Sequence, residues 1–84
     1  MKITIKQTKV EAHGDILDAV EYYKNKKYLG TAIIETGINT GWIRMRLTCL
    51  PYHQEVRGGG TLVDALNPNF YLNEIKRLKR CKII

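Results

Sequence analysis

Five cationic side chains near the end of the sequence have the type and spacing that most plainly indicate a chemistry. They lie within seven residues, at Lys76, Arg77, Lys79, Arg80 and Lys82. Lysine and arginine at this density bind phosphate oxygens, and each such contact releases counterions from a nucleic acid. The cluster therefore predicts binding of DNA or RNA. An ordinary solvated helix face, with cations favoured near the helix C-terminus, is the other explanation.

A second candidate surface comes from alternation along one segment. Trp42, Arg44 and Arg46 are spaced two residues apart, so a strand would place all three on one side. An aromatic ring can stack on a base while guanidinium groups hold phosphates, and Tyr28 on the preceding strand is placed to join them. The alternative is that Trp42 covers part of the core or an oligomer interface.

A third candidate is a glycine-rich segment with the order Arg57, Gly58, Gly59, Gly60 and Thr61. Successive glycines let backbone N–H groups converge on an anion, and an arginine can clamp it. This segment supports an alternative function, an inhibitor or sequestering protein of a phage or other mobile element that binds an acidic host protein or a small nucleotide. The spacing matches neither a Walker A loop nor a dinucleotide fingerprint, and a flexible linker is the simpler explanation.

Catalytic and metal chemistry has little support in the sequence. His13 and His53 are the only histidines, and Cys49 and Cys81 the only cysteines. The histidines would suit acid–base cleavage of RNA, which makes a small metal-independent ribonuclease the minority hypothesis. A zinc site would need all four residues to converge without any Cys-x-x-Cys pair. We expect a non-enzymatic protein with no catalytic residue, metal or cofactor.

These candidate residues must be positioned by a small set of elements. Alternation over residues 2–6 predicts a first strand. From Asp15 onward the apolar residues recur at helical spacing, which predicts a helix built on Ile16, Ala19, Val20 and Tyr23. Asp15 would be its N-cap, and Asp18 would complement the helix dipole. The lysines at 24, 26 and 27 suit its C-terminal end.

The second half of the chain predicts a hairpin followed by a helix. Residues 28–35 and 42–50 read as strands joined by a glycine- and asparagine-rich turn. Residues 51–60 lack periodicity and read as a loop, and 61–66 fit either a helical turn or a short strand. Asn67 and Pro68 then begin a helix that runs to about Arg80. Residues 81–84 form a short strand or fray.

The expected fold class is α+β: a small antiparallel β-sheet with two main helices packed on it, in the order β-α-β-β-loop-α, within one domain spanning residues 1–84. The hydrophobic fraction of 44% and charged fraction of 26% are those of a globular chain. A core this small is often supplemented by association, so we expect a homo-oligomer.

The net charge and the cysteine content indicate the kind of partner and the cellular compartment. The chain has 14 Lys and Arg against 8 Asp and Glu, a net charge of +6, which attracts acidic partners. Only two cysteines and no signal-like or membrane-spanning apolar run indicate a cytoplasmic protein with no membrane partner. The leading expectation is a small nucleic-acid-binding protein, and an acidic protein or nucleotide ligand is the alternative.

Overall fold

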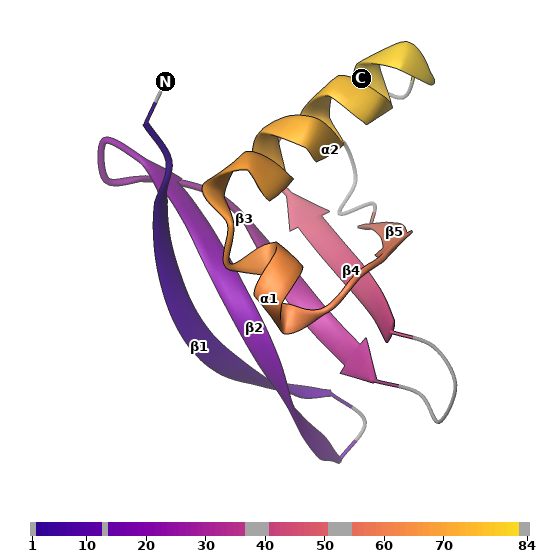
Figure 1. Ribbon diagram of the computed structural model, residues 1–84. Coiled ribbons are helices and arrows are strands. Elements are labelled where there is room, and N and C mark those ends of the chain that lie inside the picture. Colours follow the sequence, from indigo (N-terminus) through magenta and orange to yellow (C-terminus); the bar gives the residue numbers. More distant parts are fainter. Residues whose placement is uncertain (1, 13, 37–40, 51–54, 83–84) are drawn as a thin grey trace.

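The computed structural model describes residues 2–12, 14–36, 41–50 and 55–82, and its largest element is a five-stranded antiparallel sheet. The strands follow one another in space as they do in sequence, and two helices come after them (Figure 1). The elements are β1 (Thr4–Ala12), β2 (Asp15–Lys24), β3 (Lys27–Thr36), β4 (Gly41–Leu47), β5 (Glu55–Gly59), α1 (Leu62–Ala65) and α2 (Pro68–Arg80).

This arrangement shows that the expected order β-α-β-β-loop-α is wrong. The protein is mainly β, and both helices follow the sheet instead of alternating with its strands. The strands predicted over residues 28–35 and 42–50 do form an antiparallel pair, with Gly30 opposite Leu47 and Ile34 opposite Ile43, but the second strand ends at Leu47 and residues 48–50 are not part of it. Their connecting turn at residues 37–40 lies outside the described residues.

The predicted helix beginning at Asp15 is the strand β2, paired with β1 on one side and β3 on the other. Ala19 and Val20 are adjacent in sequence and point to opposite faces of the sheet, yet both are fully buried. A strand covered on both faces loses the apolar–polar alternation by which strands are recognised. Lys26, one of the lysines assigned to the end of that helix, and its neighbour Asn25 instead have positive φ values of 67° and 51° in the tight β2–β3 hairpin.

The predicted loop over residues 51–60 was also wrong in its described part. Residues 55–59 form β5, which pairs with β4 so that Arg57 lies opposite Arg44 and Val56 opposite Met45. The glycines hid this strand because they contribute no side-chain pattern. The undecided segment 61–66 contains the short helix α1, and Cys81 and Lys82 form a turn after α2, while residues 83–84 lie outside the described part.

The helices cover one face of the sheet, as Figure 1 shows for α1. Alternate residues of the strands project towards them, including Val20 and Tyr22 from β2, and Ile43 and Met45 from β4. From the helical side, the buried contributions are Ala65, Tyr71 and Leu78. This single apolar layer is the core, and it fixes α2 against the sheet.

Tyr22 joins the sheet directly to the helices. Its side chain is fully buried, and its hydroxyl donates a 2.5 Å hydrogen bond to the backbone carbonyl of Ala65 in α1. Its ring lies 5.6 Å from that of Tyr71 in α2, measured between centroids. One strand residue therefore positions both helices.

The other face of the sheet, which we call the open face, is covered by its own side chains. Ile33 and Ala19 lie opposite each other on this face and are 1% and 0% exposed. No helix among the described residues lies over them, because α1 and α2 pack on the opposite face. The open face therefore carries buried apolar residues although both helices pack on the other side of the sheet.

Candidate nucleic-acid interface

The helix α2 was predicted correctly and holds the first candidate site. Asn67 is its N-cap, with the side-chain oxygen accepting a 3.0 Å hydrogen bond from the Asn69 backbone, and Pro68 occupies the first helical position. Tyr71 and Leu78 are buried at two-turn spacing, which turns the opposite side of α2 outward. The local sequence signals therefore fix both the helix and its orientation.

The structure separates the five cations near the end of α2 into two groups. Arg77 binds Glu74 one turn earlier, with Nε donating at 3.0 Å and Nη2 at 2.6 Å to the same carboxylate oxygen. This hydrogen bond raises the pKa of Arg77 above its ordinary value. Arg77 is therefore engaged within the helix and is a weak candidate for a phosphate contact.

The other four cations are exposed, and none is paired with a carboxylate side chain; we call them the α2 basic surface, which consists of Lys76, Lys79, Arg80 and Lys82. All eight Asp and Glu residues of the sequence lie in the described part of the chain, and none of them forms an ion pair with these four cations. A shallow depression on this surface is lined by Asn73, Lys76, Lys79 and Arg80. Positive charge here is free to meet an external anion.

The second candidate surface lies elsewhere. Trp42, Arg44 and Arg46 project from β4 on the side opposite to Ile43 and Met45, which pack against the helices. The sheet therefore lies between these three residues and the helix layer that contains α2. The two surfaces that the sequence suggested do not combine into one continuous interface.

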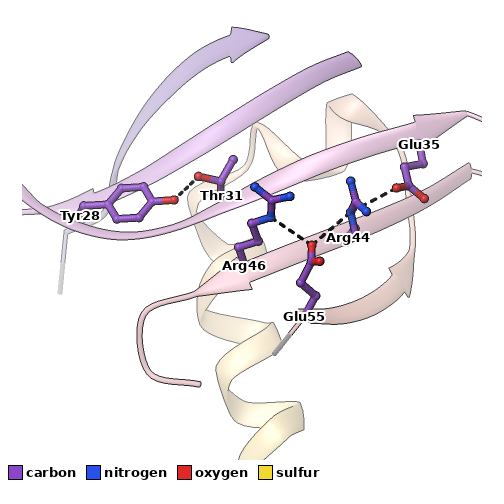
Figure 2. A network of polar contacts seen from close by, with 6 residues as sticks. All are labelled: Tyr28, Thr31, Glu35, Arg44, Arg46 and Glu55. Carbon is purple, nitrogen blue, oxygen red and sulfur yellow. Dashed lines mark hydrogen bonds and ion pairs between the residues drawn. The ribbon is translucent and has the colours of Figure 1, made fainter. Parts of the chain in front are cut away.

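The arginines of β4 are also balanced by carboxylates, as Figure 2 shows. Arg46 Nε donates a 3.1 Å hydrogen bond to a carboxylate oxygen of Glu55 on β5. Arg44 Nε lies 3.2 Å from that oxygen and 3.2 Å from one of Glu35 on β3, although neither contact has hydrogen-bond geometry. The Arg44 side chain is only 12% exposed, so its partners here are protein carboxylates. This network suits holding three strands together better than gripping phosphate.

The aromatic residues of the open face have mixed environments. Trp42 is 46% exposed, so it does not fill the core. Tyr28 packs edge-on against Tyr23, with ring centroids 5.7 Å apart, and its hydroxyl is hydrogen-bonded to Thr31 (Figure 2). Tyr28 therefore lies on the same face as the β4 arginines but is held by its own neighbours.

The third candidate, Arg57 to Thr61, is used for structure. Gly58 and Gly59 belong to β5, and a side chain on Gly60, which has φ +155°, would approach Ile43 to 2.8 Å. Thr61 caps α1, and the Asp64 carboxylate accepts a 2.9 Å hydrogen bond from the Thr61 backbone N–H. The Asp64 carboxylate thus already accepts the Thr61 N–H that a bound anion would use. Arg57 remains exposed on the open face.

Other reactive residues add no further site. His13 and His53 lie outside the described residues, so the minority ribonuclease hypothesis is not tested. Cys49 and Cys81 are exposed free thiols. Among the residues with described positions, no group of three or more His, Cys, Asp or Glu is arranged to hold a metal.

Sequence reasoning missed the carboxylates that decide which arginines are available. Glu74 lies three residues before Arg77, a spacing visible in the sequence as a helical pair. Glu35 and Glu55 meet Arg44 only through the pairing of three strands, which the sequence does not state. Asn69 and Asn73 are exposed on α2, but they carry no charge and match no motif, so the sequence did not single them out.

Comparison of the chain with protein-family models, curated proteins and solved structures found no match. No helix within the described ranges is both long and apolar enough to cross a membrane.

Proposed function

We propose that this protein is a non-enzymatic nucleic-acid-binding protein whose main contact is the α2 basic surface. The observation that supports this proposal is the group of four exposed cations without a carboxylate partner. Residues 73–82 contain five cations and a single carboxylate, Glu74, which Arg77 engages. A polyanion that binds here displaces no internal ion pair.

The size and position of the charge favour a polymeric anion over a small one. Lys76, Lys79 and Arg80 lie along the last turns of α2, a span of about 6 Å at 1.5 Å per residue, and Lys82 follows in the turn after the helix. The depression they line is shallow and open, which does not enclose a small molecule. A nucleic-acid backbone, with successive phosphates along its length, can meet several of these cations at once.

The proposed contact leaves out Trp42, Arg44 and Arg46. They lie on the opposite face of the sheet, and Glu35 and Glu55 already balance the two arginines. Moving these carboxylates away would break contacts that join β3, β4 and β5. We also place the protein in the cytoplasm, which is supported by its two exposed free thiols.

The test is the salt dependence of binding to a fluorescein-labelled 20-base-pair DNA duplex of arbitrary sequence, measured by fluorescence anisotropy. Four phosphate contacts predict a slope of log K against log salt near −3.6, at about −0.9 per contact. Affinity should then fall about 150-fold between 50 and 200 mM salt. Replacing Lys76 and Lys79 by glutamine should reduce the slope to about −1.8.

A matched control removes the same amount of charge elsewhere. Lys24 and Lys27 are exposed at the β2–β3 hairpin, and their replacement by glutamine lowers the net charge by the same two units. This control should keep a slope close to that of the unmodified protein. An equal loss of slope in both double variants would show that total charge, and not the α2 basic surface, is responsible.

A further inference from the structure

The outward side of α2 carries uncharged amide side chains as well as cations, and the two kinds are arranged in a regular order. Asn69, Asn73, Lys76 and Arg80 are all exposed and follow one another at spacings of four, three and four residues. Because a helix repeats every 3.6 residues, these four side chains form one ridge over about 16 Å. Amides occupy the first half of the ridge and cations the second half.

The two ridge amides have no structural task that the described residues reveal. Asn67 caps the helix, whereas no hydrogen bond joins the side chain of Asn69 or Asn73 to another described residue. Asparagine is a poorer helix former than lysine or glutamate, so helix propensity does not account for it. Asn73 also lines the same depression as Lys76, Lys79 and Arg80. The amide and the cations are therefore close enough to contact the same bound molecule.

We propose that α2 enters the major groove of double-stranded DNA, with Asn69 and Asn73 reading base edges while the α2 basic surface contacts phosphates. This inference depends on the proposed function. A B-form major groove, about 12 Å wide, admits an α-helix, and asparagine donates to and accepts from the N7 and N6 positions of adenine. A straight helix cannot follow the curved groove along its whole length. With the amide half of α2 in the groove, the cationic half leaves it and meets the DNA phosphate backbone.

The remaining geometry favours duplex DNA over other nucleic acids. In Figure 1 the C-terminal half of α2, which carries the cations, projects beyond the strands, and Asn69 and Asn73 in the first half are exposed. The ridge has no aromatic residue on which an unpaired base could stack, because Tyr71 is buried and Phe70 packs against the core. The major groove of an RNA duplex is too narrow and deep for side chains to read.

The experiment selects bound duplexes from a random-sequence DNA pool and measures affinities for the selected DNA, the matching RNA duplex and each single strand. Selection should enrich a short motif that contains adenine, and the selected duplex should bind at least about 10-fold more tightly than the RNA duplex. Asn73→Ala should lower affinity for the selected duplex roughly 5- to 150-fold, towards that for unselected DNA. Lys79→Gln should weaken selected and unselected DNA by the same factor.

The outcomes separate the two proposals. Salt-dependent binding without an enriched motif, or with equal affinity for RNA duplex or single strands, overturns groove reading and leaves the proposed function standing. Failure to bind any of these nucleic acids overturns both. Asn73→Ala replaces a poor helix former by the best one, so unfolding does not account for a loss of selectivity, and circular dichroism verifies this.

Discussion

The hydrogen bond between Tyr22 and Ala65 provides the sharpest test of how the helices are held. Replacing Tyr22 by phenylalanine removes one hydroxyl and keeps the ring in the core, beside Tyr71 at 5.6 Å. The carbonyl of Ala65 then loses its 2.5 Å partner in a fully buried site. The variant therefore isolates the polar contact from the packing.

The expected loss follows from the burial of both groups. An intramolecular hydrogen bond contributes about 1 kcal/mol net, and a buried acceptor left without a partner costs about 1–3 kcal/mol. For a domain of this size each kilocalorie corresponds to about 4–8 °C in Tm. Urea unfolding followed by far-ultraviolet circular dichroism should thus show a lower midpoint and an unchanged slope, and Tm should fall by at least about 4 °C.

Tyr71→Phe is the matched control, because the Tyr71 hydroxyl has no hydrogen-bond partner among the described residues while its ring lies in the same core. It should change stability by less than about 0.5 kcal/mol. If Tyr22→Phe is as stable as the parent protein, or if both variants lose the same amount, the Tyr22 hydroxyl does not join the sheet to α1.

The same hydroxyl predicts a pH dependence. Burial, with a smaller effect from Glu74, raises the pKa of Tyr22 above the ordinary value of 10.0 that applies to the unfolded chain. Above pH 10 the folded protein therefore holds a proton that the unfolded chain releases, so stability falls as the pH rises. Tyr22→Phe should lose less stability than the parent protein over this range, and parallel pH profiles would contradict the assignment.

Three further outcomes are expected. Glu74→Gln should free Arg77 and steepen the salt slope of DNA binding by about 0.9, whereas an unchanged slope would show that Arg77 does not reach phosphate. Glu55→Gln should lower the free energy of unfolding by about 1 kcal/mol, since Arg44 is mostly buried and keeps only Glu35, and an unchanged urea midpoint would contradict this. Gly30→Ala should lower the free energy of unfolding by about 1–3 kcal/mol in the same assay, because the alanine Cβ would lie 2.5 Å from the Arg46 carbonyl oxygen. An unchanged free energy of unfolding would mean that β3 and β4 move apart at no cost.

The sequence predicted α2 well because every signal for it is local. Asn67, Pro68 and the apolar spacing all lie within the helix or next to it, and none depends on the rest of the fold. The segment from Asp15 failed for the opposite reason. Its apolar pattern reflects burial on both faces of a central strand, and that burial depends on neighbours from β1, β3 and the helices.

The candidate site was predictable to a similar extent. The position of the cations on α2, and the pairing of Glu74 with Arg77, follow from helical spacing alone. The state of Arg44 does not, because its carboxylates come from two other strands whose register brings them together. Cations on a helix can thus be judged from a sequence more safely than cations on a sheet.

The order of strands in the sheet also has a consequence for how the protein is made. Since each strand pairs with the one before it, hairpins can form in sequence as the chain leaves the ribosome, without waiting for distant segments. The apolar row that includes Val20, Ile43 and Met45 has no cover until α1 and α2 emerge. At about 5–20 residues per second, the nascent sheet therefore passes through an interval in which it exposes a hydrophobic surface to chaperones or to other nascent chains.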